Sequence, residues 1–222
     1  MQNRDFMEKV FPFWEELLQT QKELLRASVK EKTFSKGEVL CYGAEDCMGL
    51  LLVKSGRLRA FIISESGREI TLYRLLDGDV CFFSAACVIK NIDFEVHLEV
   101  EKDTAAFLVP VQVYESLMQS SLQVAGYTNQ LMASRFSEVM WIMEKVLFTS
   151  FDSRLASFLR EQSKMEESDV LNTTHEEIAR HMGSAREVVT RMLKYFQTEG
   201  IVKLSRGRIT ILDGEKLEKL VK

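Results

Sequence analysis

The pattern of apolar and polar residues between about Thr33 and Val109 is typical of β-structure. Short runs with partial alternation are separated by turns that contain Gly56, Gly67 or Gly78. Alternation with a period of two places one face of a strand in a core. Several such strands, about ten residues apart, are typical of a sandwich or of a roll that closes on itself. The pattern therefore predicts an N-terminal β-roll.

The period changes after Pro110. From Val113 to Phe148 there is no proline, Gly126 is the only glycine, and helix formers dominate, so 111–149 is predicted as one long helix. Its apolar residues lie on more than one face, and such a helix must be covered on more than one side. One side can pack on the roll and the other on a second copy of the chain, although a single-chain core explains the same pattern. The residues assigned to the dimer helix are Val124, Tyr127, Leu131 and Val139.

A smaller α-rich domain is predicted over 150–222. A hinge at Thr149–Asp152 precedes a helix that either Asp152 or Ser153 can cap. After this helix, two short helices are predicted on either side of a glycine, which is the organisation of a helix-turn-helix.

The first of these short helices is predicted to run to Met182. Thr173 or Thr174 can serve as its N-cap. Glu176 or Glu177 can complete a capping box with that threonine. The buried side of this helix is predicted to consist of Ile178, Ala179 and Met182.

The second short helix is predicted between Gly183, which supplies a tight turn, and about Glu199. Ser184 can cap its first turn. Apolar residues recur in it at i, i+3, i+4 and i+7 and predict a core-facing stripe. That stripe consists of Val189, Met192, Leu193 and Phe196. The opposite face consists of Arg186, Glu187, Thr190, Arg191 and Lys194.

This opposite face has the composition required to read bases. Arginine can make two parallel hydrogen bonds to guanine O6 and N7, and glutamate can accept one from cytosine N4. Beyond the helix, two strands around a Ser205–Gly207 turn predict a wing whose basic side chains can contact phosphates. The alternative is an unrelated helical hairpin. The residues assigned to DNA binding are Thr174, Ser184, Ala185, Arg186, Glu187, Thr190, Arg191, Lys194, Lys203, Arg206 and Arg208.

The charge distribution fits this assignment better than the net charge does. The chain as a whole carries a formal charge of −4, but residues 180–208 contain seven basic and two acidic side chains. An acidic body with one basic patch is compatible with a polyanionic partner. A solvated helix face explains such a patch about equally well.

The sequence predicts a cytoplasmic protein that does not enter a membrane. It contains no run of about eighteen apolar residues, as a membrane-spanning helix requires. Near the N-terminus, Asp5, Glu8 and Lys9 interrupt the apolar positions. This start therefore reads as a small amphipathic helix and lacks the continuous apolar core of a signal peptide.

With these motifs in place, the chain resembles the superfamily of bacterial transcription factors that contains the cyclic-AMP receptor protein and the fumarate–nitrate regulator (Crp/Fnr). The resemblance covers nearly the whole chain and is carried by FSKGEVL, GLLLVKSGRLRAFIISESGREITLYRLLDGD, TAAFLVP, DSRLASFL and THEEIARHMGSAREVVTRML. The family pattern of Arg-Glu, with a second Arg four residues after the Glu, is met by Arg186, Glu187 and Arg191.

The resemblance implies an α+β fold made of a cyclic-nucleotide-binding-like jelly roll, a long dimerisation helix and a C-terminal winged helix-turn-helix. The corresponding domains are 1–110, 111–149 and 150–222. In the cyclic-AMP branch, the three recognition residues read a half-site of TGTGA type. The resemblance therefore implies a homodimer that reads a similar inverted repeat with two recognition helices one DNA turn apart.

The effector pocket departs from that of the nucleotide-binding members. Those proteins carry a Gly-Glu near the start of the phosphate-binding cassette and an Arg-Ser or Arg-Thr pair near its end. Here Phe83 stands about where the glutamate would be, and Val96 and His97 stand where the pair would be. The phosphate would lack its bidentate partner, and Glu95 and Glu99 would repel it. The sequence therefore argues against cyclic AMP and cyclic GMP as effectors.

All four cysteines fall in the predicted β-roll, as two C-x5-C pairs. A structural disulfide framework is not expected in a cytoplasmic protein. One hypothesis is a sensory site, in which the thiols oxidise or hold a metal or cluster and His97 is a fifth group. The alternative is four small buried apolar side chains, and C-x2-C spacing, which is common in zinc and iron–sulfur sites, is absent. The candidate sensor residues are Cys41, Cys47, Cys81, Phe83, Ser84, Cys87 and His97.

Three classes of function can be compared. An enzyme of the cupin type needs clustered histidines with a carboxylate to hold a metal, and the predicted roll contains only His97. A sensor attached to some other effector is disfavoured because the output domain is visible in the sequence. The sequence therefore predicts a regulator, not an enzyme, in which a signal in the roll shifts the long helices and re-aims the recognition helices. Double-stranded DNA and a second copy of the chain are its expected partners, and RNA polymerase is a further candidate.

Overall fold

The computed structural model describes residues 2–41, 49–81 and 96–221. The chain forms two compact units, Met1–Ile62 with Leu72–Val139 and Ile63–Thr71 with Met140–Lys222. The helices and strands of the two units make a mixed α and β fold, which confirms the predicted class. Within the described part of the chain, no helix is both long and apolar enough to cross a bilayer.

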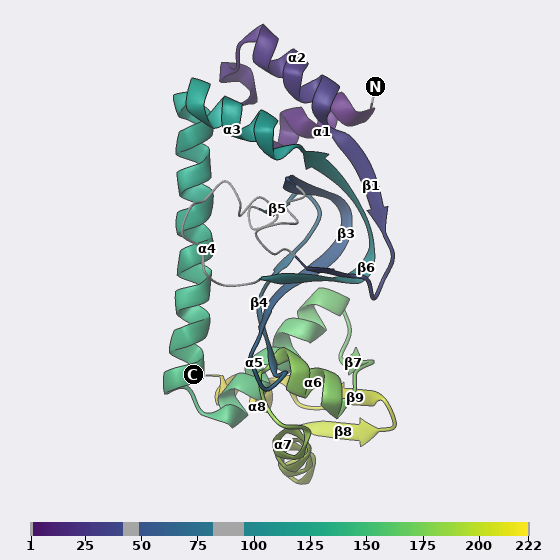
Figure 1. Ribbon diagram of the computed structural model, residues 1–222. Coiled ribbons are helices and arrows are strands. Elements are labelled where there is room, and N and C mark those ends of the chain that lie inside the picture. The colour runs from purple at the N-terminus through teal and green to yellow at the C-terminus, as the bar shows by residue number, and fades with distance from the viewer. Residues whose placement is uncertain (1, 42–48, 82–95, 222) are drawn as a thin grey trace. The chain divides into compact units, whose positions relative to one another are not determined.

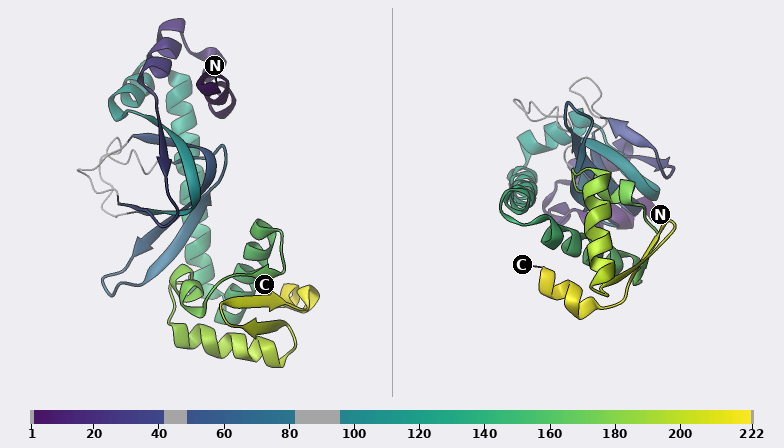
Figure 2. Two further views of the ribbon diagram at one scale, coloured as in Figure 1. Left: turned by 90° about the vertical axis from the view of Figure 1, so that its right-hand side faces the viewer. Right: turned by 90° about the horizontal axis from the view of Figure 1, so that it is seen from below.

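An antiparallel sheet of six strands forms most of the first unit. The strands are β1 (Lys30–Phe34), β2 (Val39–Cys41), β3 (Leu50–Ile63), β4 (Glu69–Leu75), β5 (Val80–Cys81) and β6 (His97–Val109). Ile63–Thr71, where β3 ends and β4 begins, belongs to the second unit. The strand order is β1-β6-β3-β4, while β2 also pairs with β6 and β5 with β3. The long strands curve strongly (Figures 1 and 2), so the sheet wraps around its own apolar face.

The apolar run at the start of β3 is explained by burial on both faces of the strand. Leu50 and Leu52 belong to a core that includes the N-terminal helices. Leu51 and Val53 point the other way, into the core inside the roll. A strand buried on both faces carries a continuous apolar run in place of alternation, so only a partial period of two is visible here.

Gly56 is required where β3 bends away from regular pairing. Its φ is +118°, a region that L-residues with a side chain rarely adopt. A Cβ at this position would lie 2.6 Å from the carbonyl oxygen of Asp103. The register of β3 against β6 also shifts on both sides of this residue, so the bulge and the glycine occur together.

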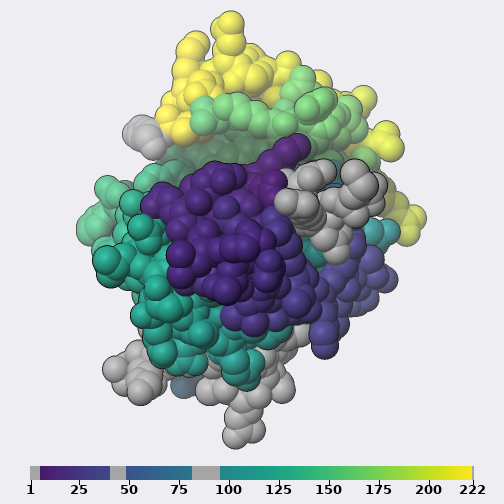
Figure 3. Space-filling model, turned by 90° about the horizontal axis from the view of Figure 1, so that it is seen from above, coloured from purple at the N-terminus to yellow at the C-terminus, as the bar shows by residue number. Residues whose placement is uncertain are grey.

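Helices cover one end of this unit. They are α1 (Gln2–Val10), the 3₁₀ helix η1 (Trp14–Glu16), α2 (Gln19–Ser28) and α3 (Val111–Ser120), together with the start of α4 (Leu122–Phe148), which then continues along the sheet. Phe11 and Trp14 from the N-terminal segment share a buried core with Tyr114 of α3 and Val124 of α4. Figure 3 shows the N-terminal residues in purple lying against the teal residues of α3 and α4.

The single long helix predicted over 111–149 is wrong in one respect, because the chain leaves helical geometry at Ser121. The backbone of Ser121 is extended, with φ −138° and ψ 117°. The break lets α3 fold beside α4, and the hydroxyl groups of Tyr114 and Thr128 lie 2.7 Å apart in the core. Helix propensity does not mark this break because serine is only slightly unfavourable in a helix.

The second unit contains the predicted C-terminal α-rich domain. Its elements are α5 (Phe151–Glu166), β7 (Val170–Leu171), α6 (His175–His181), α7 (Arg186–Thr198), β8 (Val202–Ser205), β9 (Arg208–Ile211) and α8 (Gly214–Leu220). The strands form a small sheet in the order β7-β9-β8. One apolar core joins α5, α6, α7 and α8 to this sheet, through residues such as Leu159, Ile178, Leu193 and Ile209.

The cap predicted for α5 is wrong by two or three residues. The N-cap is Ser150 and not Asp152 or Ser153. Asp152 lies instead in the first turn, where a carboxylate favours the helix dipole, and the side chain of Ser153 is buried. The hinge is therefore shorter than predicted, since only Thr149 and Ser150 lie between α4 and α5.

Candidate nucleic-acid interface

The scaffold helix α6 begins with the predicted capping box. The Thr174 hydroxyl accepts a hydrogen bond from the Glu177 amide at 3.1 Å. The Glu177 carboxylate accepts one from the Thr174 amide at 2.6 Å. Both interactions satisfy amides that have no partner within the helix. Of the two alternatives left open at each position, the structure selects Thr174 and Glu177, and Ile178, Ala179 and Met182 are buried as predicted.

We expect Thr174→Ala to destabilise the C-terminal unit by about 1 kcal/mol, the typical cost of losing an N-cap side chain. The free energy of unfolding in urea, followed by circular dichroism, measures the change. Thr173→Ala is the matched control, because the Thr173 hydroxyl contacts only the exposed carboxylate of Glu177, at 3.2 Å. A larger loss for Thr173→Ala than for Thr174→Ala would contradict the cap assignment.

A tight turn joins α6 to α7. Gly183 has a φ of +64°, which glycine adopts without the cost that a Cβ imposes. The predicted cap of α7 is wrong: its N-cap is Ala185, which has no side chain that can cap, and not Ser184. The Ser184 amide is instead bonded to the Ala179 carbonyl at 3.0 Å. This bond closes the turn around Gly183, so Ser184 contributes its backbone and not its hydroxyl to the motif.

The two faces of α7 divide as the sequence predicts. Val189, Leu193 and Phe196 are fully buried in the core of the unit. Arg186, Glu187, Arg191 and Lys194 are exposed, and Thr190 is half-buried between them. The helix is therefore anchored by one face, while the opposite face is free to meet a ligand.

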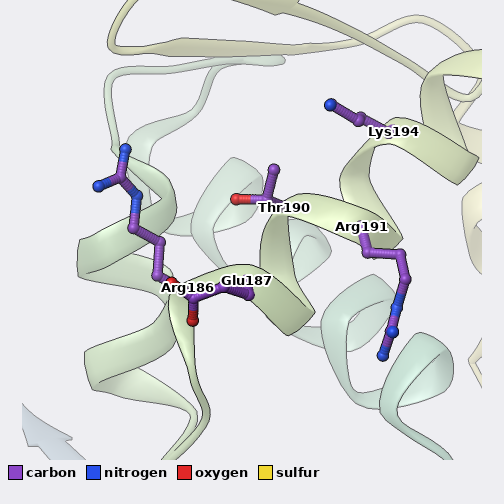
Figure 4. Close-up of a pocket in the computed structure, with 5 residues that line it drawn as sticks. All are labelled: Arg186, Glu187, Thr190, Arg191 and Lys194. Atoms are coloured by element: carbon purple, nitrogen blue, oxygen red, sulfur yellow. The ribbon is translucent and has the colours of Figure 1, made fainter.

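The exposed face of α7 borders a shallow concavity of about 430 Å³. It is lined by Arg186, Glu187, Thr190, Arg191 and Lys194. Figure 4 shows the two arginines extending to opposite sides, with Thr190 between them. This arrangement places two bidentate donors, one acceptor and one hydroxyl on a single side of a helix, which suits contact with base edges.

The basic side chains of this face and of the wing are held weakly or not at all by acidic neighbours. Arg186 Nε lies 4.0 Å from Glu176 Oε2, and both side chains are more than half exposed. Exposed pairs of this kind contribute little to stability. Among the described residues there is no ion pair with Arg191, Lys194, Lys203, Arg206 or Arg208. These cations can therefore bind a polyanion at little cost.

The predicted wing is confirmed as the hairpin of β8 and β9. Ser205 pairs with Arg208 at its end, and Gly207 takes a φ of +68° in the turn. Lys203, Arg206 and Arg208 are exposed. The wing lies next to α7 (Figure 1), so its cations extend the basic surface of the helix.

One contact at this surface was not predicted. His175 Nδ1 lies 2.9 Å from Thr190 Oγ1, which ties the first residue of α6 to the centre of the exposed face of α7. Partial burial lowers the pKa of His175, and the charges of Arg186 and Lys194 lower it further. The spacing of 15 residues crosses a turn, so no helical period reveals the pair.

Several of the predicted sensor residues fall outside the described residues. This applies to Cys47, Phe83, Ser84 and Cys87, and to the side chain of Cys41. The backbone of Cys41 pairs with that of His97, and the His97 ring lies 5.4 Å from that of Phe61. Within 2–41, 49–81 and 96–221 there is no cluster of three histidine, cysteine or acidic side chains that could hold a metal.

Cys81 is buried inside the roll. Cys81 adjoins Tyr73. Burial is the main cause, and the interaction with Cys81 a second one, that raises the pKa of the Tyr73 hydroxyl well above its usual value. Val96, at the position where nucleotide-binding relatives are expected to carry arginine, is buried in the same apolar core.

The four residues assigned to the dimer helix contact the chain's own cores. Val124 is fully buried in the core beneath the N-terminal helices, and Tyr127 and Leu131 pack against the same core. Val139 packs against the core of the roll. Only Val124 is fully buried by its own chain, whereas Tyr127, Leu131 and Val139 are half-buried, so their part in a dimer stays a prediction. Spacing reveals that a helix has an apolar side but not what that side meets.

Comparison with known proteins places this geometry in context. Residues 31–121 match the family model of the cyclic nucleotide-binding domain. Residues 153–220 match that of the Crp-like helix-turn-helix domain. Together the two models cover the β-sheet and the C-terminal motif.

Two relatives and one solved structure illustrate the similarity. A cyclic AMP receptor protein of Thermus thermophilus is 23% identical, over 94% of this chain and 96% of its own. The fumarate and nitrate reduction regulatory protein of Vibrio cholerae is 27% identical, over 86% and 78%. A crystal structure from Eubacterium rectale, assigned to the Crp/Fnr family of transcriptional regulators, is 52% identical over 96% of this chain and 98% of its own, with a TM-score of 0.93. The names of all three describe receptor or regulatory proteins.

Proposed function

Because the chain belongs to the Crp/Fnr family of DNA-binding transcription regulators, we propose that it acts as a homodimer on an inverted repeat of TGTGA-like half-sites. The regulator class follows from the family, whereas the half-site, the dimer and the controlling signal are the substance of the proposal. A soluble regulator of this kind would act on DNA in the cytoplasm and would meet RNA polymerase there.

The observation that carries the proposal is the division of α7 into a buried and an exposed face. Three fully buried side chains fix the rotation of the helix, so Arg186, Glu187 and Arg191 point outward together. Such a helix fits the major groove, whose width admits one α-helix. The same three residues carry the family's pattern for a TGTGA half-site, which supports that sequence as the first candidate.

Dimerisation is supported by a second apolar face of α4. Phe136, Met140, Met143 and Leu147 recur at i, i+4, i+7 and i+11, and their exposed fractions are 67, 40, 48 and 63%. We call these four residues the α4 seam. Their spacing is the heptad pattern of a coiled coil. An apolar stripe of this kind that is exposed to water favours association with another apolar surface. A second copy is the natural occupant, because a palindromic site requires a two-fold symmetric reader.

A controlling signal other than cyclic AMP or cyclic GMP is supported by Val96. Its side chain is 4% exposed and lies among apolar neighbours inside the roll. A cyclic phosphate at this place would lose its water without gaining a cationic partner there, which is costly. We therefore expect calorimetric titration with cyclic AMP to release no binding heat. Binding with micromolar affinity would exclude this part of the proposal.

The experiment that tests the proposal is selection of DNA sequences from a random pool by the purified chain. We expect the selected duplexes to share an inverted repeat whose half-site centres are about one helical turn apart, roughly 10–10.5 base pairs. A duplex with the same base composition in scrambled order is the control. Equal binding of the selected and the scrambled duplex would overturn the proposal.

The wing is expected to contribute affinity but no sequence preference. Replacing Lys203 with alanine removes one exposed cation from each subunit, and each lost phosphate contact reduces the salt dependence of binding by about one unit of slope. A dimer would lose about two such units, and its affinity for selected and scrambled duplexes would fall by the same factor. Fluorescence anisotropy at several salt concentrations measures both quantities. A selective loss on the selected duplex would show that Lys203 reads bases.

A further inference from the structure

The pair formed by His175 and Thr190 connects the scaffold helix to the surface that meets DNA. Their side chains are 2.9 Å apart, and Thr190 lines the concavity between Arg186 and Arg191. Thr190 is thus the one hydroxyl-bearing residue among the five that line the concavity, and this hydroxyl contacts a titratable ring. The orientation of that hydroxyl depends on which His175 nitrogen carries a proton.

The protonation state of His175 sets whether the Thr190 hydroxyl offers a ligand a hydrogen-bond donor or only an acceptor. When neutral His175 accepts at Nδ1, the Thr190 hydroxyl donates to the ring and offers only lone pairs to a ligand. When His175 is charged, both ring nitrogens are donors. Thr190 must then accept from Nδ1, and its own proton is free to point toward the concavity. A hydroxyl donor suits guanine O6 and N7 or thymine O4, whereas an acceptor suits cytosine and adenine amino groups.

We propose that His175 is a positioning residue for base readout, which takes up a proton when the chain binds DNA and thereby presents the Thr190 hydroxyl as a donor to the bases. This inference rests on the proposed function, because it requires α7 to enter a groove. The proton comes from solvent and resides on the imidazole, so no bond other than N–H is made.

The charges around His175 give the direction of the effect. Partial burial lowers the pKa of the ring in the free chain, and the charges of Arg186 and Lys194 on α7 lower it further. On its own helix, Glu176 is close to Arg186 but screens it weakly at 4.0 Å. DNA phosphates brought to this basic face would offset both cations and add negative charge, so the pKa rises on binding. A site whose pKa rises on binding favours binding at lower pH.

The test is the pH dependence of affinity for a duplex that the wild-type chain has selected from a random pool. Each unit by which the pKa rises on binding strengthens binding about tenfold per subunit at low pH. We therefore expect the wild-type dissociation constant to fall by about tenfold to a hundredfold between pH 8 and pH 6. A wild-type affinity that does not change over this range would overturn the inference.

Two substitutions separate the proton from the hydrogen bond. His175→Asn places an amide near the position of Nδ1, so it can hold Thr190 but cannot titrate, and we expect its affinity to be independent of pH. His181→Asn is the matched control on the same helix, since His181 Nδ1 lies 3.0 Å from Thr71 Oγ1. This control is expected to keep the wild-type slope. The inference fails if His175→Asn retains the slope or if His181→Asn abolishes it.

The specificity of Thr190 supplies an independent readout. Thr190→Val keeps the shape of the side chain but removes the hydroxyl, and we expect it to relax preference at one base pair of each half-site. His175→Asn, selected against the same random pool at pH 6, is expected to alter preference at that same base pair. Changes at different base pairs would refute the coupling. If the wild-type chain selects no sequence at any pH, the proposed function itself has failed, so the two failures are distinguishable.

Discussion

Replacing Arg186 with alanine is expected to cause the largest loss of sequence-specific DNA binding of any single substitution on α7. A bidentate arginine–guanine contact discriminates by about 1–3 kcal/mol. A homodimer loses it in both half-sites, so the selected duplex would bind about thirtyfold to ten-thousandfold more weakly. The side chain is exposed and makes only a long contact with Glu176, so the fold should remain intact.

Selection from a random pool with this variant measures the prediction directly. We expect one base pair in each half-site to become degenerate while the others keep their preference. Binding to a scrambled duplex should weaken far less, because only a general phosphate attraction is lost there. Lys203→Ala is the contrasting control, with equal losses on both duplexes. If Arg186→Ala behaves like Lys203→Ala, the assignment of Arg186 to base readout is wrong.

The second large effect is expected from Met140→Glu in the α4 seam. Met140 is the second of the four seam positions, and a carboxylate there would face its copy across a two-fold axis. Burying two like charges at such a contact is strongly unfavourable. We expect the variant to be a monomer in sedimentation equilibrium at micromolar concentration. Its affinity for a palindromic duplex should fall by about a hundredfold or more, because the second half-site no longer binds intramolecularly.

Trp141→Glu is the matched control for this prediction. Trp141 is 48% exposed, compared with 40% for Met140, but one residue of α-helix turns its side chain by about 100°. Trp141 therefore lies off the seam, where it stacks with the Lys145 ammonium at 3.6 Å from the ring centre. We expect this variant to remain a dimer. A monomeric Trp141→Glu together with a dimeric Met140→Glu would place the interface on another face of α4.

Much of the DNA-binding motif could be predicted because its determinants are local. The capping box joins residues three apart, and the stripe of α7 repeats within four residues, so each is decided by contacts within one or two turns. Where a local rule failed, a longer-range contact had overridden it. Ser184 has the right chemistry for a cap, but the turn around Gly183 uses its amide for a bond to Ala179.

The assignment of helix faces shows the limit of periodicity. Val124, Tyr127, Leu131 and Val139 were correctly recognised as apolar helix positions, yet they meet the chain's own cores. The four residues of the α4 seam stay exposed. Both sets look alike in sequence, because burial against the same chain and burial against another copy require the same apolar surface.

The sequence alone determined the order of elements and the anchored and free faces of α7, since these depend on residue type and on near neighbours. It also predicted an apolar residue, Val96, in place of the family's phosphate-binding arginine. The tertiary structure decided which partners meet across long separations. It broke the long helix at Ser121 and buried the two faces of the first residues of β3 in two different cores. It also brought His175 into contact with Thr190. Such contacts arise when distant segments are packed together, and the free energy of that packing is not encoded in any short window of the chain.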